Sequence, residues 1–173
     1  KNAMTALIII FSVSSYSSNL ERLVIPEGFE ISIFADELES PRQLAETDAG
    51  YVIAGSKKGD KIYALQDSDL DGYAEKKILI ADGLQNPTGV SFYQGNLYFA
   101  EIDTIWVVKN IDDWLNAGSE MLPTKTVFMN DLPSETWHGF KYIDFGPDGN
   151  LYIPVGVPCN ICLEPQTKDN RFA

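Results

Sequence analysis

The chain has 173 residues, of which 45% are hydrophobic and 12% aromatic, a composition that excludes an intrinsically disordered protein. Its 13 Lys and Arg residues against 25 Asp and Glu residues give a formal net charge of −12. Because phosphate binding needs a basic face, this balance argues against a nucleic acid as partner.

The N-terminal residues resemble a targeting segment. Lys1 precedes the apolar run Thr5–Val13, TALIIIFSV, which is followed by the small and polar residues SSYSSN. A basic start, a short apolar run and a small-residue tail are typical of a secretory signal peptide, and the run is too short to span a bilayer. We therefore predict a signal peptide over residues 1–19 and a periplasmic or secreted mature chain without a membrane span. A buried N-terminal strand or part of a membrane anchor are the alternatives.

Beyond residue 20 the sequence is a succession of short β-type runs. The turn clusters TDAG, KKGD, YQGN and GPDGN separate them. One segment, Ile111–Met121, is predicted to be helical, with Gly118 as its stop. The predicted strands are, in chain order, Glu30–Asp36, Tyr51–Ser56, Lys61–Asp67, Lys76–Asp82, Gly89–Tyr93, Asn96–Ile102, Thr104–Asn110, Lys125–Asp131, Phe140–Phe145 and Asn150–Gly156. The sequence thus predicts an all-β chain with one helix.

A strand–turn–strand pattern repeats along the chain. Each copy has a tight turn that contains a glycine, Gly50, Gly95 or Gly149, followed by an aromatic-rich strand, and the spacings are 45 (95 − 50) and 54 (149 − 95). Four-stranded propeller blades repeat at about 40–50 residues, whereas a β-sandwich would not repeat one turn signature at this period. About 150 residues remain after the leader, enough for roughly three blades. Because propellers close with about 4–8 blades, residues 20–173 are predicted to be the N-terminal part of a larger propeller.

An acidic loop follows the predicted strand Lys61–Asp67. Its sequence, DSDLDGYAE, has carboxylates at alternate positions and a glycine, the pattern that a hard cation such as Ca²⁺ requires. An EF-hand is excluded because Ile78 stands where its closing glutamate would be and the loop joins two strands. We predict a structural Ca²⁺ site at a hairpin tip, with a solvated acidic turn as the alternative. The candidate ligands are Asp67, Asp69, Asp71, the backbone carbonyl of Tyr73, and Glu75.

The chain's only histidine and both of its cysteines lie in WHGFKYIDFGPDGNLYIPVGVPCNIC. His138 directly precedes a predicted strand, and at the mouth of a propeller channel an imidazole can act as a general base or a metal ligand. Cys159 and Cys162 form a C-x-x-C pair that lacks further zinc ligands and follows a strand rather than opening a helix. In an exported chain we predict a local disulfide, with free thiols or pairing to another segment as alternatives.

The segment around His138, together with VIPEGFEISIFAD, KIYALQDSDLDGYAE and ADGLQNPTGVSFYQGNLYFAEI, resembles the pyrroloquinoline quinone (PQQ)-dependent soluble glucose/sorbosone (pyranose) dehydrogenases. The resemblance covers about Leu23 to Cys162. It implies a six-bladed propeller that holds PQQ on its top face, with Ca²⁺ assisting the cofactor. It also implies that His138 takes the proton of the sugar C1 hydroxyl while the C1 hydride passes to the quinone.

The resemblance further implies that Gln85 and Asn86 offer polar contacts to a sugar, although a turn before Pro87 explains them equally well. The family has an acidic residue before the catalytic histidine. Here Trp137 stands at that place, which puts glucose specificity in doubt and suggests a stacking platform. The cofactor-clamping residues of the family would lie beyond residue 173. Arg42 is a weak candidate for a cation at the channel, a surface pair with Glu39 or Glu46 being favoured.

The sequence therefore predicts the N-terminal portion of a PQQ-dependent sugar dehydrogenase, inactive as a fragment, with a small sugar as substrate and an unspecified electron acceptor. One alternative is a metal-dependent propeller lactonase, to which Glu101 or Asp103 could contribute ligands. Another is a non-catalytic binding propeller, in which His138 is only a structural residue at the start of a strand. A shared fold cannot separate these functions, because function depends on the site.

Overall fold

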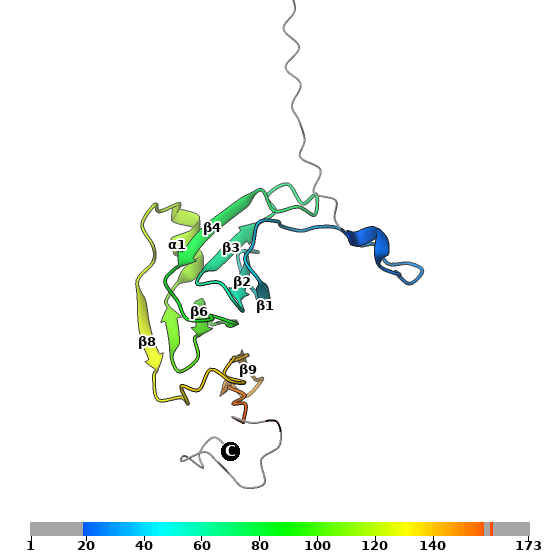
Figure 1. Ribbon diagram of the computed structural model, residues 1–173. Helices are drawn as coiled ribbons and strands as arrows, with labels where there is room; N and C mark the ends of the chain where they lie inside the picture. Colours follow the sequence, from blue (N-terminus) through cyan, green and yellow to red (C-terminus); the bar gives the residue numbers. More distant parts are fainter. Residues whose placement is uncertain (1–18, 158–159, 161–173) are drawn as a thin grey trace, which may run out of the picture. The chain divides into compact units, whose positions relative to one another are not determined.

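Antiparallel sheets make up the fold of the computed structural model, which describes residues 19–157 and 160 (Figure 1). One four-stranded sheet has the order β1 (Pro41–Glu46), β2 (Val52–Ser56), β3 (Ile62–Gln66) and β4 (Lys76–Ala81). A second has the order β5 (Gly89–Tyr93), β6 (Asn96–Ala100), β7 (Ile105–Val108) and β8 (Lys125–Met129). A two-stranded sheet pairs β9 (Asp144–Phe145) with β10 (Leu151–Tyr152). Each sheet follows chain order, as propeller blades do.

The first strands of the three sheets lie next to one another, since β5 contacts both β1 and β9. Each first strand turns into the second at one of the repeated glycines. Gly50, Gly95 and Gly149 have φ values of +81°, +78° and +76°, a backbone region in which side chains other than glycine are strained. The predicted turn repeat is therefore confirmed, and it marks the innermost hairpin of each sheet.

A second repeated feature connects successive sheets. The backbone N–H of Leu84, before β5, donates to the carbonyl of Asp60 at 3.0 Å. The N–H of Leu132, before β9, donates in the same way to the carbonyl of Asp103 at 3.3 Å. Each segment that leads into an inner strand thus binds the turn between the second and third strands of the preceding sheet.

The main core lies between the two four-stranded sheets. Phe99, Ile53, Ile62, Leu97 and Val90 are fully buried there, in one cluster with two side chains of the helix. Burying a side chain of this size contributes about 1.5–3 kcal/mol relative to exposure. The alternation of apolar residues along the strands therefore holds the sheets face to face.

The predicted helix is confirmed as α1 (Ile111–Ala117), which buries Ile111 and Leu115. It ends at Gly118, whose φ of +63° allows its N–H to bond the carbonyl of Leu115 at 3.2 Å. With seven residues, α1 lies inside the longer of the two repeat intervals. No helix in the described part of the chain has the length and apolar character needed to cross a bilayer.

The strand predictions differ from the structure at residues 30–36, at β1, and in the third sheet, where the predicted strands Phe140–Phe145 and Asn150–Gly156 are only the short strands β9 and β10. Residues 30–36 form no strand in the described chain, although FEISIF alternates well, because a strand needs a ladder of hydrogen bonds and the bond from Ala74 N–H to the Phe34 carbonyl does not make one. Conversely, β1 was not predicted, since PRQLAE is polar and begins with proline. Proline is tolerated as the first residue of a strand. The third sheet also has only two short strands among the described residues, where a four-stranded blade was predicted.

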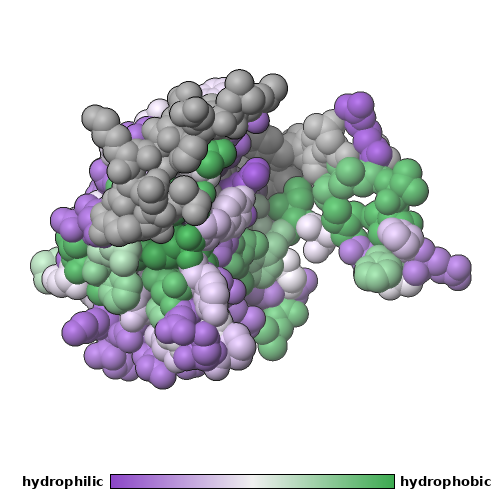
Figure 2. All heavy atoms as spheres, turned by 90° about the horizontal axis from the view of Figure 1, so that it is seen from below, coloured by the Kyte–Doolittle hydropathy of each residue, from purple (hydrophilic) through white to green (hydrophobic). Residues whose placement is uncertain are grey.

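The chain divides into two units, residues 1–32 and 33–173. In the first, the 3₁₀-helix η1 (Asn19–Arg22) precedes a segment with exposed apolar side chains, including Val24 and Phe29. Figure 2 shows hydrophobic residues on the surface of the molecule. Nearly all of the predicted signal peptide, and both Cys159 and Cys162 of the predicted disulfide, lie outside the described residues.

Candidate functional site

The segments that lead into the inner strands, and the turns between second and third strands that they bind, gather at one end of the sheets. We call this end the top face. It comprises residues 38–40, 55–61, 82–89, 101–104 and 130–143. Lys57 N–H donates to the carbonyl of Ser40 at 2.9 Å, and Ser56 N–H donates to that of Pro87 at 2.8 Å. Gly89 lies against the carbonyl of Lys141. All predicted sugar-site residues therefore belong to this one face.

His138 is exposed on the top face and has a φ of +57°. Its Nδ1 lies 2.9 Å from the carbonyl oxygen of Val157. Because a carbonyl oxygen can only accept, Nδ1 carries the hydrogen in the neutral ring. Nε2 then has its lone pair available and no hydrogen-bond partner among the described residues. This tautomer is the one that a general base needs.

The turn that carries His138 is tightly packed. Gly139 N–H donates to the carbonyl of Thr136 at 3.1 Å. A side chain at Gly139 would overlap the carbonyl of Glu135, and one at Gly156 would overlap the carbonyl of His138. Since a positive φ costs about 1–3 kcal/mol for a residue such as histidine, these contacts are what keep its backbone in that conformation.

Trp137 lies beside the histidine and is 59% exposed. The centroids of its ring and the His138 ring are 5.1 Å apart, with an angle of 35° between the planes. A large exposed aromatic surface next to an exposed imidazole is an arrangement that can hold a sugar ring or a flat cofactor.

Gln85 and Asn86 form a turn on the same face. The backbone N–H of Gln85 donates to the carboxylate of Glu101, and Asn86, with a φ of +49°, accepts a bond from Thr88 N–H at 2.7 Å. The Gln85 side chain is exposed and that of Asn86 is half-buried. The turn alternative thus has direct support, whereas the sugar contacts remain predictions.

Glu101 and Asp103, the residues suggested for a lactonase metal, serve other roles. One oxygen of Glu101 accepts from Gln85 and the other accepts from Trp106 Nε1 at 2.6 Å. Asp103 accepts from the hydroxyl of Thr104 at 2.9 Å. Of the residues that the structure describes, neither belongs to a group able to hold a metal ion.

Arg42 is the second residue of the inner strand β1, and among the described residues it does not form the surface pair with Glu39 or Glu46 that the sequence favoured. Its guanidinium donates to the hydroxyl of Tyr142 and lies 5.8 Å from that ring's centroid. Next to it, the Gln43 amide bonds both the carbonyl and the N–H of Ile143, at 2.7 and 3.3 Å. These contacts join β1 to the segment before β9, because the chain brings both to the same end of the inner strands.

Lys141 was missed by the sequence analysis. It is 1% exposed, and its Nζ donates to the carbonyl of Gly139 at 2.6 Å. Burial lowers the pKa of Lys141, while the nearby carboxylates of Asp103 and Glu135 act in the opposite direction. One signal could have revealed it: in FKYIDF, Lys141 shares its alternating register with Ile143, which is also buried.

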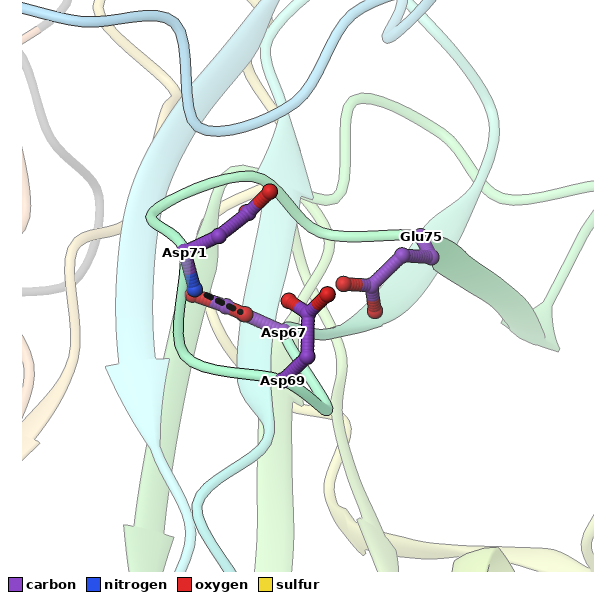
Figure 3. Close-up of side chains that lie close together, drawn as sticks. All are labelled: Asp67, Asp69, Asp71 and Glu75. Carbon is purple, nitrogen blue, oxygen red and sulfur yellow. Dashed lines mark hydrogen bonds between the residues drawn. The ribbon is translucent and has the colours of Figure 1, made fainter.

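The acidic loop contains none of the top-face residues. It joins β3 to β4, as predicted (Figure 3). One carboxylate oxygen from each acidic residue lies within 4.8 Å of the others. Ca²⁺ binds oxygens at about 2.3–2.6 Å, so two ligand oxygens of one ion lie at most about 5 Å apart. The carboxylates therefore fit one Ca²⁺ ion. The four residues are Asp67, Asp69, Asp71 and Glu75.

Backbone N–H groups shape this loop from within. Asp67 accepts bonds from the N–H groups of Asp71 at 3.2 Å and Gly72 at 2.9 Å. A hydrogen bond with Glu75, with lesser contributions from burial and Asp71, raises the pKa of Asp69. The N–H of Ser68 is the main cause of a lowered pKa at Glu75. A bound cation would offset this crowding of negative charge.

Comparison with known proteins places the chain in a family. Residues 15–172 match the family described as "Domain of unknown function (DUF7133)". The chain belongs to this DUF7133 family. An uncharacterized protein of Borreliella burgdorferi is 25% identical over 171 residues, which cover 94% of this chain and 43% of that protein.

Two solved structures share the fold of this DUF7133 member. A Thermus thermophilus protein described as "putative oxidoreductase (glucose dehydrogenase)" matches with a TM-score of 0.52 and 18% identity, over 72% of this chain and 39% of that one. The PQQ-bound aldose sugar dehydrogenase of Streptomyces coelicolor matches with a TM-score of 0.50 and 17% identity, over 74% and 41%. The predicted all-β, partial-propeller fold is thus confirmed. The chain spans about two-fifths of the length of these relatives.

Proposed function

We propose that this chain is the N-terminal portion of a PQQ-dependent dehydrogenase that oxidises an aldose or a related sugar. The observation that carries the proposal is His138, exposed on the top face with no partner for Nε2 among the described residues, in a fold shared with a PQQ-bound aldose sugar dehydrogenase. The substrate would be a small sugar and the mature protein periplasmic or secreted. A nucleic acid partner is not expected for a chain with a net charge of −12.

In this proposal the His138 Nε2 accepts the proton of the sugar C1 hydroxyl. Loss of that proton raises the electron density on C1, so that the C1–H electron pair leaves as hydride and a lactone forms. When bound, PQQ supplies the acceptor for this hydride. The Nδ1 bond to Val157 keeps the imidazole oriented and stabilises the protonated ring that results. Trp137 would stack on the sugar, and Gln85 and Asn86 would bind its hydroxyls.

The described residues fit the proton-accepting and stacking parts of this site. PQQ carries three carboxylates, and the basic side chains that would hold them are expected from the remainder of a longer protein. Activity is therefore proposed for the full-length protein, and the 173-residue chain alone is expected to be inactive.

The test is an assay of the full-length protein with added PQQ and Ca²⁺, in which dye reduction is measured over a panel of aldoses. Sugar-dependent reduction that requires PQQ would support the proposal. Hydrolysis of lactones without PQQ would favour the lactonase instead. If PQQ produced no absorbance change and no sugar were oxidised, a non-catalytic binding propeller would be the better conclusion.

We also propose that the acidic loop between β3 and β4 binds a structural Ca²⁺ ion. The fit of its four carboxylates to one ion supports this. The phenol of Tyr73 is engaged elsewhere, since it donates to Asp36 at 3.2 Å, so Tyr73 would bind the ion through its backbone carbonyl.

Calcium at ten times its Kd is expected to raise the free energy of unfolding by about 1.4 kcal/mol, following RT ln(1 + [L]/Kd). For a domain of this size the rise corresponds to roughly 3–6 °C in Tm, measurable by calorimetry with and without a chelator. Asp69→Asn should lose the rise in Tm with calcium. In chelator it should be no less stable than the wild type, because the change relieves repulsion between the loop carboxylates. The control Glu120→Gln, at an exposed position outside the loop, should keep the rise in Tm with calcium. A full response in Asp69→Asn would contradict the site.

A further inference from the structure

The buried lysine beside the candidate base is not used by the proposed chemistry. Lys141 is 1% exposed, although lysines are seldom fully buried in proteins. Its ammonium group donates to the carbonyl of Gly139, and it forms no ion pair within 4.0 Å among the described residues. The carboxylates of Asp103 and Glu135 act from farther away, to raise the pKa that burial lowers. Burying an amine in this way costs stability, which calls for a reason other than stability.

The residue that Lys141 binds is the one directly after His138. Gly139 has both of its backbone polar groups fixed, the N–H by Thr136 and the carbonyl by the Lys141 ammonium. The peptide between His138 and Gly139 is therefore held at its N–H by Thr136, and the next peptide, between Gly139 and Phe140, is held at its carbonyl by Lys141. A charge-assisted hydrogen bond is roughly twice as strong as a neutral one, so the lysine is the stronger of the two restraints.

His138 needs such a restraint because its backbone conformation is unfavourable. At a φ of +57° the residue would relax toward negative φ if the two peptides that follow it were free to rotate. Rotation would carry the ring away from Val157, and the Nδ1 bond that fixes its tautomer would be lost. The backbone of Lys141 is itself fixed, since its carbonyl lies against Gly89 at the start of β5.

We propose that Lys141 is a positioning residue, which anchors the Gly139 carbonyl so that His138 keeps its conformation and presents Nε2 on the top face. The inference rests on the proposed function of His138 as base, but the effect of Lys141 on the His138 conformation can be tested without PQQ or sugar. A full positive charge holds the carbonyl most strongly, which explains why a charged group is retained at a buried position.

The decisive variant is Lys141→Met, which keeps most of the side-chain volume and removes the donor. Its ring nitrogens are observed by ¹⁵N NMR on the full-length protein without PQQ or sugar, and the His138 signals are identified by their loss in His138→Gln. The wild type should show the Nδ1–H tautomer. Lys141→Met should show a mixture of both tautomers, while its Tm is unchanged or higher because the buried charge is gone.

Ile143→Val is the matched control, since Ile143 is also 1% exposed in the same segment. It should lower Tm by a few degrees through a small cavity and leave the tautomer unchanged. In the PQQ assay, Lys141→Met should lower kcat about tenfold with little change in KM, because a tautomer mixture reduces the fraction of competent base.

An unchanged tautomer in Lys141→Met, whatever happens to Tm, would overturn the positioning role. A tautomer shift in a protein that oxidises no sugar would leave that role intact and count against the dehydrogenase alone. The two proposals therefore fail by different observations.

Discussion

Replacing His138 with glutamine in the full-length protein is expected to lower kcat for sugar oxidation by about 10²–10⁴-fold, the usual contribution of a general base. The amide keeps the size and polarity of the imidazole but has no lone pair basic enough to take the hydroxyl proton. KM should change little, because the ring contributes mainly to the transition state. Steady-state kinetics with saturating PQQ and Ca²⁺ measure both constants.

The control for this variant is Lys109→Gln, an exposed residue after β7 that lies outside the top face. It should retain full activity. Calorimetry should give His138→Gln a Tm close to that of the wild type, since the exposed ring buries little apolar surface. Full sugar oxidation by a correctly folded His138→Gln protein would remove the histidine from the mechanism.

Gly89→Ala is expected to be strongly destabilising for the addition of a single methyl group, at about 2–3 kcal/mol. The new Cβ would overlap the backbone carbonyl of Lys141 and approach the Cβ of Ala100 to 3.3 Å. A backbone carbonyl cannot swing aside as a flexible side chain does, so β5 and the segment before β9 would have to move apart. The expected loss in Tm is roughly 4–12 °C for a domain of this size.

Gly50→Ala is the control that distinguishes the steric overlap at Gly89 from the cost of backbone strain. Gly50 has a φ of +81° and no atom within 4 Å of an added Cβ, so alanine there costs only the left-handed conformation, about 1 kcal/mol. Urea denaturation of both variants gives the two free energies of unfolding. Equal losses would mean that the contact between β5 and Lys141 is not tightly packed.

Several elements could be predicted because they depend on local pattern. Residues 89–93, with strict turn signals on both sides, were predicted with the bounds that β5 has. The helix was predicted to stop at Gly118, where the left-handed cap is found. The turn glycines at positions 50, 95 and 149 revealed the blade period, since each needs a positive φ that few other residues adopt.

Other elements depend on neighbours that sequence pattern does not reveal. β1 is polar and starts with Pro41, yet it forms a strand because β2 provides the hydrogen bonds. Residues 30–36 alternate well, yet form no strand in the described chain, because the backbone hydrogen bond from Ala74 N–H to the Phe34 carbonyl, at 2.7 Å, is not continued into a ladder. A segment becomes a strand only when a neighbouring strand pairs with its backbone. An alternating pattern shows only that the segment favours the extended conformation.

The sequence by itself determined the class of fold, the blade repeat, the acidic loop and the position of His138 before an inner strand. These follow from spacing and residue type, which local backbone preferences and side-chain alternation translate directly into turns and strands. Only the tertiary structure decided which ring nitrogen of His138 bonds the Val157 carbonyl and that Lys141 is buried against Gly139. Both depend on atoms of segments brought together by packing, Val157 against His138 and β5 against Lys141, and such contacts leave no periodic trace in the chain.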